Sequence, residues 1–440
     1  MTSPATPPEA PDDAASSDAV RLRLVTRTVA IDPATLPADL LDLLPPEGGT
    51  AWIRRGDGLV AWGEVTRITR HGADRMRDAA AEWRRVVERA VVRDEVRVPG
   101  TGPIAFGSFS FAADSPAGGV LVVPRVVVGR RGSVAWATTF AEGAVAPTPA
   151  LAPQRAPLAP GAVEFTHGAL DARSWQDAVA DAVHRIRAGG LDKVVLARDV
   201  VARTTEPLDV RWALHRLSRD YHACWTFCVD GLLGATPELL VRSEKGLVTS
   251  RVLAGTIRRT GDDDADLAHA ALLAHSSKDL EEHEYAVASL SDALGPFCSS
   301  TNVPETPFVL HLPNVLHLAT DVTGVLAADD AGAHPSSLLL ADALHPTAAV
   351  AGTPTADACR VIADLEAMDR GRYAAPVGWI GADGDGEWAL ALRSAQVGPD
   401  PRGLRLFAGC GIVAASDPAA ELAESEAKLE PMRSALGGVG

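Results

Sequence analysis

Residues 224–259 constrain the fold more than any other segment of the chain. The run CWTFCVDGLLGATPELLVRSEKGLVTSRVLAGTIRR consists of short apolar stretches separated by glycine-containing residue pairs. Asp230-Gly231 and Lys245-Gly246 have the composition of tight hairpin turns, so the run predicts a β-meander. Strands joined by such turns are antiparallel, which argues against strict alternation of parallel strands and helices.

Amphipathic helices separate the predicted strands, so the sequence predicts the α+β class. Apolar spacing at helical period predicts helices at 73–91, 174–190, 276–294, 365–372 and 419–436. Alternating or β-branched runs predict strands at 20–29, 102–111, 118–129 and 191–204, a hairpin over 373–397, and a strand with a turn over 404–417.

Composition along the chain predicts three regions. Residues 1–18 are rich in Pro, Ala, Ser and Asp and predict a disordered tail. Residues 19–155 predict an N-terminal α+β region that packs on the core, and the Pro/Ala-rich stretch 145–160 is the best linker candidate. Residues 156–440 form the third region, which holds most of the motifs.

Charge and hydropathy exclude several function classes. The 440 residues carry a formal net charge of −16, which argues against nucleic-acid binding because that depends on a basic face. The N-terminus lacks the basic and apolar regions of a signal peptide, and no apolar run reaches about 18 residues. We therefore expect a soluble cytoplasmic protein without a membrane partner. The five scattered cysteines do not suggest a disulfide framework.

Two isolated ionisable residues are candidates for proton transfer. Lysine is rare, at four residues against 37 arginines, and Lys193 begins the apolar run KVVLA. Burial would favour the neutral amine, a possible general base, although a strand-end lysine that reaches solvent is the alternative. Glu238 lies between a Gly/Pro turn and an apolar strand, where burial would raise its pKa and make it a proton donor. A solvated turn glutamate is the alternative.

Two predicted helices carry further charged candidates. His283 falls on the apolar stripe of helix 276–294 and is expected to pack against the core, with Glu282 beside the stripe. In helix 419–436, Glu421, Glu424 and Lys428 fall within one narrow arc. Two carboxylates one turn apart suit a hard divalent cation. A salt-bridged exposed helix, with Glu424 and Lys428 as an i,i+4 pair, is the alternative.

Nine motifs in sequence order resemble those of the chorismate-utilising enzymes, a family that includes anthranilate, aminodeoxychorismate, salicylate and isochorismate synthases. The resemblance covers residues 165–432. Its motifs are KVVLAR (193–198), GATPELLV (234–241), LAGT (253–256), SSKDLEEHEYAV (276–287), LHLAT (316–320), LHPTAAVAGTP (344–354), YAAPVGW (373–379), GDGEWALALRSA (384–395) and AGCGIVAASDPAAELAESEAKL (408–429).

The resemblance implies a fold and a reaction. It implies a large β-sandwich of mainly antiparallel sheets flanked by helices, with 156–440 as the chorismate-binding catalytic region. Ala254 stands where aminodeoxychorismate synthases carry a nucleophilic lysine, and Ala349 where ammonia-using and salicylate-forming members carry threonine. These features resemble the isochorismate-forming members, which add water at C2 of chorismate while the C4 hydroxyl leaves. Salicylate synthase and anthranilate synthase are the alternatives.

The resemblance also implies residue roles. Lys193 corresponds to the general base and Glu238 to the general acid. Mg²⁺ is the implied cofactor, with Glu282, Glu421 and Glu424 as ligands. The implied substrate contacts are Gly255, Thr256, His317, Ala349, Arg393, Gly409 and Lys428. The resemblance further implies a monomer that needs no glutaminase subunit, and its product would enter siderophore, menaquinone or other biosynthesis.

Overall fold

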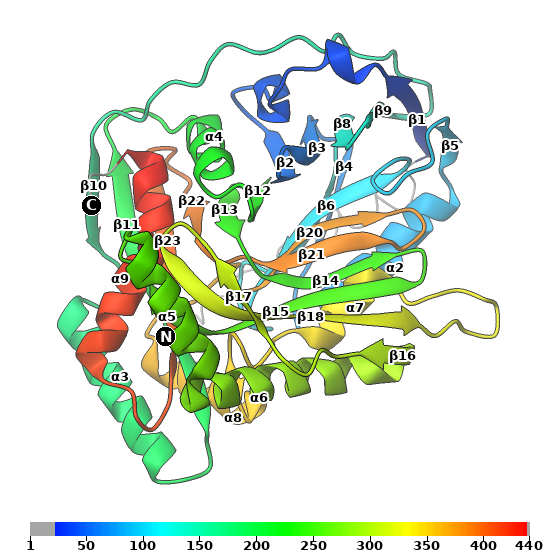
Figure 1. Cartoon of the computed structure of the whole chain (residues 1–440). Coiled ribbons are helices and arrows are strands. Elements are labelled where there is room, and N and C mark those ends of the chain that lie inside the picture. Colours follow the sequence, from blue (N-terminus) through cyan, green and yellow to red (C-terminus); the bar gives the residue numbers. More distant parts are fainter. Residues whose placement is uncertain (1–22, 438–440) are drawn as a thin grey trace, which may run out of the picture.

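In a computed structural model, the chain forms two large sheets with helices packed around them (Figure 1). The structure describes residues 23–437, except for the side chains of Lys278 and Glu282. The predicted tail at 1–18 therefore lies outside the described residues.

The larger sheet runs through both the N-terminal and the C-terminal parts of the chain, and every neighbouring pair except β1–β5 is antiparallel. In spatial order its strands are β10 (Val163–His167), β11 (Lys193–Thr204), β23 (Gly403–Ile412), β22 (Ser394–Val397), β13 (Leu232–Thr236), β12 (Trp225–Val229), β2 (Gly49–Arg54), β3 (Asp57–Trp62), β8 (Val126–Arg131), β9 (Val134–Glu142), β1 (Leu24–Ile31) and β5 (Val91–Asp94), with β19 (Gly352–Thr353) beside β11.

The second sheet is antiparallel throughout its described pairings. In spatial order its strands are β16 (Cys298–Asn302), β18 (Val315–Leu326), β15 (Leu247–Arg258), β14 (Leu239–Glu244), β21 (Gly386–Leu390), β20 (Pro376–Gly381), β6 (Ile104–Phe109), β7 (Gly119–Val123) and β4 (Thr66–Arg70), with β17 (Phe308–His311) beside β18.

The helices fall into two groups by the sheet they contact. Those on the larger sheet are α3 (Ala172–Arg187), α4 (Val210–Asp220), α8 (Thr355–Leu365) and α9 (Pro418–Leu436). Those on the second sheet are α2 (Arg75–Glu88), α5 (Asp263–His275), α6 (Ser277–Leu294) and α7 (Ser337–Leu344). Three short 3-10 helices are also described: η1 (Pro33–Thr35), η2 (Leu40–Leu43) and η3 (Gly295–Phe297). Two mainly antiparallel sheets flanked by helices confirm the α+β prediction. No described helix is both long and apolar enough to cross a membrane.

The larger sheet buries both of its faces. Because successive side chains on a strand point to opposite faces, Trp52 of β2 joins one apolar cluster while Ala51 and Ile53 join another. The first cluster includes residues of both sheets, such as Phe227 of β12 and Trp388 of β21. The second lies under η2, α4 and α9.

The predicted turns are confirmed, since Asp230-Gly231 joins β12 to β13 and Lys245-Gly246 joins β14 to β15. The predicted single meander is wrong, because β12 and β13 pair in the larger sheet whereas β14 and β15 pair in the second. The chain crosses between the sheets at Pro237-Glu238, and a local turn pattern does not show which sheet each hairpin joins.

One predicted helix is wrong. Helical spacing at 365–372 favoured a helix there, but α8 occupies Thr355–Leu365 and ends where that segment begins. Ala367 and Gly371 both have positive φ, which a right-handed helix does not accommodate. The buried side chains of Glu366 and Arg370 bond the backbone of other segments, and these contacts hold 366–372 as a loop.

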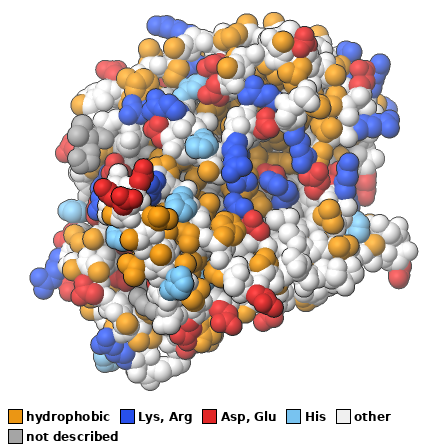
Figure 2. All heavy atoms as spheres, viewed as in Figure 1, with side chains coloured by type: hydrophobic (Ala, Val, Ile, Leu, Met, Phe, Trp, Pro, Cys, Tyr) orange, Lys and Arg blue, Asp and Glu red, His pale blue; other side chains and the backbone are white. Residues whose placement is uncertain are grey.

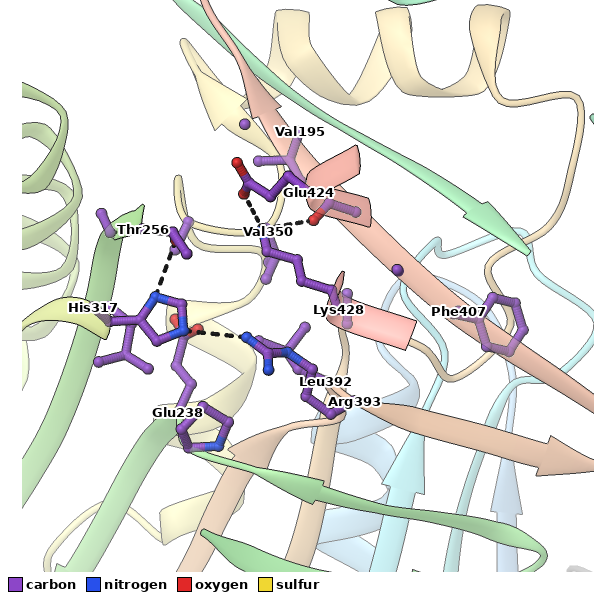
Figure 3. A pocket seen from close by; sticks show the side chains of 18 of the residues that line it. Val195, Glu238, Thr256, His317, Val350, Leu392, Arg393, Phe407, Glu424 and Lys428 are labelled. Atoms are coloured by element: carbon purple, nitrogen blue, oxygen red, sulfur yellow. Dashed lines mark hydrogen bonds and ion pairs between the residues drawn. The ribbon is translucent and has the colours of Figure 1, made fainter. Parts of the chain in front are cut away.

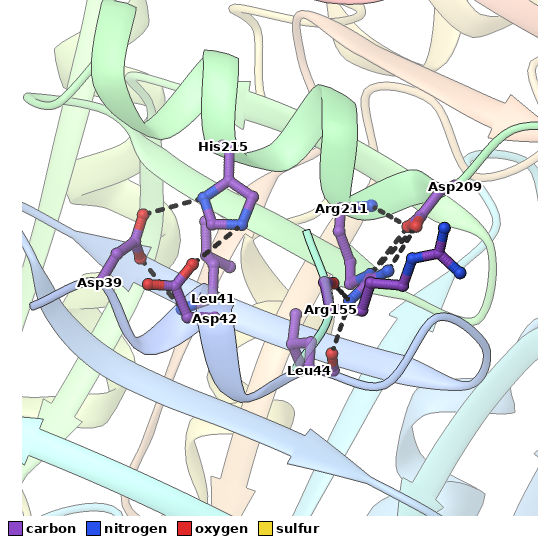
Figure 4. Close-up of polar contacts among 8 residues, drawn as sticks. All are labelled: Asp39, Leu41, Asp42, Leu44, Arg155, Asp209, Arg211 and His215. Atoms are coloured by element: carbon purple, nitrogen blue, oxygen red, sulfur yellow. Dashed lines mark hydrogen bonds and ion pairs between the residues drawn. The ribbon is translucent and has the colours of Figure 1, made fainter. Parts of the chain in front are cut away.

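The stretch 145–160 forms no helix or strand, yet it is fastened to the fold (Figure 4). The buried Arg211 of α4 donates from Nη1 to the carbonyls of Arg155 (2.9 Å) and Leu44 (3.2 Å), and Asp209 holds its guanidinium. The backbone N–H of Gln154 donates to the carbonyl of Asp42 (2.7 Å). This stretch is therefore an irregular segment held against the rest of the fold by hydrogen bonds, rather than an unattached linker.

Candidate active site

One cavity gathers the predicted site residues from both sheets and from α9 (Figure 3). All of the predicted catalytic, substrate and metal residues line it except Glu282, which lies on α6 with its side chain outside the described residues. The lining residues from the prediction are Lys193, Glu238, Gly255, Thr256, His317, Ala349, Arg393, Gly409, Glu421, Glu424 and Lys428. Their roles stay predictions; the geometry below shows what they can do.

Lys193 and Glu238 are both buried in the cavity wall. Lys193 begins β11 and is 8% exposed, and Glu238 follows β13 and is 5% exposed. Burial raises the pKa of Glu238 to about 8, against the opposing pull of Lys193, Lys428 and Arg393. The Glu238 carboxyl is therefore mostly protonated at neutral pH and can donate a proton, as the sequence predicted.

His317 of β18 stands between two cavity residues. Its Nε2 lies 3.1 Å from Nη2 of Arg393, and its Nδ1 lies 3.0 Å from Oγ1 of Thr256 (Figure 3). A guanidinium can only donate, so Nε2 accepts and the proton sits on Nδ1. Burial, with the charges of Arg393 and Lys428, holds the pKa of His317 well below its usual range. The ring is thus a neutral spacer that orients Arg393.

Two backbone irregularities shape the wall of the cavity. Gly255 interrupts the pairing of β15 with β18 between Ala254 and Thr256, and its φ is +77°. A Cβ at this glycine would lie 3.1 Å from Cβ of Asp279. Arg393 has φ +49°, a left-handed conformation that non-glycine residues adopt at a cost. This turn after β21 brings the guanidinium into the cavity.

α9 presents two carboxylates and an ammonium to the cavity. Asp417 caps the helix by accepting from the N–H groups of Ala419 and Ala420. Lys428 Nζ lies 2.7 Å from Oε1 of Glu424 and donates to the carbonyl of Gly409 (2.9 Å). Burial lowers the pKa of Lys428, but the carboxylate of Glu424 outweighs it and the net shift is upward, so the ammonium stays charged. The predicted i,i+4 pair is present, inside the cavity rather than on an exposed helix face.

The two carboxylates also form a possible metal site. Ligand atoms of Glu421, Glu424 and Cys410 lie within 4.8 Å of one another. Burial raises the pKa of the Cys410 thiol well above its usual range, and its Sγ donates to the carbonyl of Glu421. A neutral thiol is a poor ligand for a hard cation, whereas carboxylate oxygens suit Mg²⁺. The donor set therefore fits a hard divalent ion held by oxygen.

Sequence reasoning missed several lining residues. Tyr373 stacks on Phe407 with ring centroids 5.1 Å apart, and burial raises its pKa to about 12. Asp279 and Arg370 also line the cavity. Tyr373 is the first residue of the YAAPVGW motif and one of only three tyrosines in the sequence, and this rarity within a motif could have marked it as a candidate site residue. Arg370 was not predicted to line the cavity because its segment was expected to form a helix.

Other expectations concerned residues outside the cavity. His283 is 3% exposed and its Nε2 lies 2.7 Å from Oγ1 of Thr320, which confirms that it packs in the interior. Cys228 of β12 and Cys224, just before that strand, are both buried, and burial raises the pKa of each thiol to about 12.

Comparison with known proteins identifies the class of enzyme to which this fold and cavity belong. The chain matches the family description "Chorismate binding enzyme" over residues 23–437 and belongs to this family. It is similar to the salicylate biosynthesis isochorismate synthase of Pseudomonas aeruginosa, at 42% identity over 276 residues. That match covers 62% of this chain and 56% of the Pseudomonas protein, little more than half its length.

Two solved structures share the fold. One is a Bacillus anthracis protein provisionally named 2,3-dihydroxybenzoate-specific isochorismate synthase, with a TM-score of 0.73 and 31% identity over 90% of this chain and 98% of that one. The menaquinone-specific isochorismate synthase of Escherichia coli superposes with a TM-score of 0.76 over 96% of this chain and 100% of that one. Its identity is 24%, so it supports the fold alone.

Proposed function

We propose that this protein is an isochorismate synthase, which converts chorismate to isochorismate. The observation that carries the proposal is the buried pair of Lys193 and Glu238 in one cavity, with Glu238 held in its protonated form by a pKa of about 8. The similarity to isochorismate synthases of other organisms supports the same reaction.

The reaction needs a base and an acid at separate positions. Water bonds to ring C2 and gives a proton to Lys193, the ring double bonds shift, and the C4–O bond breaks. Glu238 protonates the departing hydroxyl, which leaves as water. Without these proton transfers water is a poor nucleophile and hydroxide a poor leaving group.

Cationic side chains would hold the substrate carboxylates. Arg393 is buried and its guanidinium is oriented by His317, which suits a bidentate grip on the enolpyruvyl carboxylate. Lys428 adds a second charge on the side of α9. Figure 2 shows basic side chains near the centre of one face of the molecule, although the chain carries a net charge of −16. Arg393 and Lys428 would therefore offset the negative net charge of the protein at the place where an anionic substrate binds.

Mg²⁺ is part of the proposal. Glu421 and Glu424 would hold it, with Glu282 as the third ligand suggested by the family resemblance. When bound, the ion would neutralise the ring carboxylate of the substrate.

By the family resemblance, Ala254 and Ala349 favour water as the nucleophile, because members that use an amine or form salicylate carry lysine or threonine at these positions. Ala349 lines the cavity and is half-buried. We further propose a cytoplasmic monomer that works without a glutaminase subunit and serves siderophore or menaquinone biosynthesis.

A product assay tests this function. Pure protein with chorismate and Mg²⁺ should form isochorismate, without prompt release of salicylate, and ammonium should not yield anthranilate. Stoichiometric salicylate, read from its fluorescence, would show that the protein is a salicylate synthase instead. Formation of anthranilate with ammonium would show that the protein is an anthranilate synthase instead.

A further inference from the structure

Side chains complete one edge of β11 where no strand covers it. β19 and β10 pair with the two ends of this edge and leave its middle open. There the carbonyl of Val195 accepts from Arg370 Nη2 (2.7 Å), and the N–H of Ala197 donates to Glu366 Oε1 (2.7 Å). The two side chains thus provide two of the hydrogen bonds that a neighbouring strand provides elsewhere in the sheet, and Trp175 Nε1 donates to the carbonyl of Ala197 (3.2 Å).

Glu366 and Arg370 form a buried ion pair with fixed geometry. Arg370 Nε lies 2.9 Å from Oε2 of Glu366, and Nη2 lies 2.5 Å from Oε1. The two side chains are 1% and 2% exposed, respectively. The third nitrogen of Arg370, Nη1, donates to the carbonyl of Val350 (2.9 Å), and the guanidinium lies 4.2 Å from the ring centroid of Phe111. Four of the five N–H groups of Arg370 thus have acceptors, and a buried charge pair needs such hydrogen bonds.

The bonds of this pair end on backbone that forms the cavity. Val195 and Val350 both line the cavity, as does Arg370. Val195 lies two residues after Lys193 on β11, and Val350 follows Ala349. One guanidinium therefore joins the strand that carries Lys193 to the loop that carries Ala349.

We propose that Glu366 and Arg370 are positioning residues that fix Lys193 relative to the 349–350 wall, and that they act through the backbone. This inference rests on the proposed role of Lys193 as the base. Displacement of a reacting group by about 1 Å costs on the order of 100-fold in rate, so a pair that fixes β11 is expected to affect turnover.

The chain offers a matched control for this pair. Arg211 is equally buried, is held by both oxygens of Asp209, and donates to two backbone carbonyls, yet it does not line the cavity (Figure 4). Arg370→Gln, Glu366→Gln and Arg211→Gln are compared at a temperature where thermal melts show all three folded. The first two should lower kcat roughly 10- to 100-fold with KM within about threefold, and Arg211→Gln should leave kcat unchanged.

A second readout does not depend on chorismate. Reductive methylation with formaldehyde and a borane, mapped by peptide mass spectrometry, follows each of the four lysines separately. Lys193 should be methylated severalfold faster in Arg370→Gln and Glu366→Gln than in the unmodified chain or in Arg211→Gln. Lys245, in the turn between β14 and β15, is the internal reference.

The outcomes separate the two proposals. Equal losses of kcat in Arg370→Gln and Arg211→Gln, a rise in KM alone, or an unchanged methylation rate of Lys193 would each overturn the positioning role. If the unmodified protein forms no isochorismate while Lys193 methylation still responds to the Glu366 and Arg370 variants, the positioning role stands and the proposed reaction is wrong.

Discussion

At the scale of single residues, Glu238 is the group whose protonation the proposed reaction depends on. Glu238→Gln should lower kcat by at least about 100-fold, since an amide cannot protonate a leaving hydroxyl. In the unmodified protein kcat should fall as pH rises through about 8, because the proton of Glu238 is lost there. Steady-state rates against pH check both, with exposed Glu305→Gln as the control.

The same residue links activity to stability. Its pKa is raised from 4.5 in an open chain to about 8 in the fold, so the folded state binds the extra proton between these values. Stability from this group is fully present below pH 4.5 and is lost as pH rises through 8. Glu238→Gln should therefore raise Tm at pH 9, measured by calorimetry, while it removes turnover. An unchanged Tm at pH 9 would contradict the burial of an ionisable carboxyl at this position.

At the scale of elements, the irregular residue of β15 has a predictable effect. Gly255→Ala places a Cβ in a left-handed position, 3.1 Å from Asp279, and should displace the wall beside Thr256. Gly132→Ala has a similar φ of +58° but no neighbour within 4 Å. Denaturant melts should show that each variant loses about 1 kcal/mol of stability. Only Gly255→Ala should raise KM for chorismate, and equal KM values in the two variants would refute the role of this wall.

α9 carries the second prediction at this scale. Removal of divalent ions with a chelator should abolish turnover, and Mg²⁺ should restore it. Glu421→Gln and Glu424→Gln should need at least about tenfold more Mg²⁺ for half-maximal rate, because each loses a charged oxygen ligand. Glu430→Gln, on the same helix but outside the cavity lining, should behave as the unmodified chain. Full activity in chelator would disprove the metal requirement.

The sequence predicted these elements unevenly, for physical reasons. Apolar periodicity and Asp-Gly or Lys-Gly turns are local signals, so the two hairpin turns and the bounds of α9 were predicted correctly to within a residue. The division of the strands β12 to β15 between two sheets depends on distant partners and was not predicted. The order of the nine motifs, through the family resemblance, predicted which residues line the cavity. The left-handed Arg393, the tautomer of His317 and the loop around Arg370 depend on contacts between distant segments, and no local pattern encodes them.

At the scale of the whole molecule, the N-terminal and C-terminal regions share both sheets. β2 pairs with β12 in the larger sheet, and β6 pairs with β20 in the second (Figure 1). Residues 156–440 expressed alone would expose both strand edges and apolar side chains such as Trp225. We expect this fragment to aggregate, and the whole chain to unfold in one cooperative calorimetric transition. A soluble fragment with a sharp melt would show that the regions fold independently.

The addition of water at C2 is the central chemical claim, and isotope labelling tests it directly. Chorismate incubated with the protein and Mg²⁺ in ¹⁸O-enriched water should yield isochorismate with one ¹⁸O, located at the new hydroxyl by mass spectrometry and NMR. Isochorismate without ¹⁸O would mean that the hydroxyl moves within the substrate, and Lys193 would then have no water to activate.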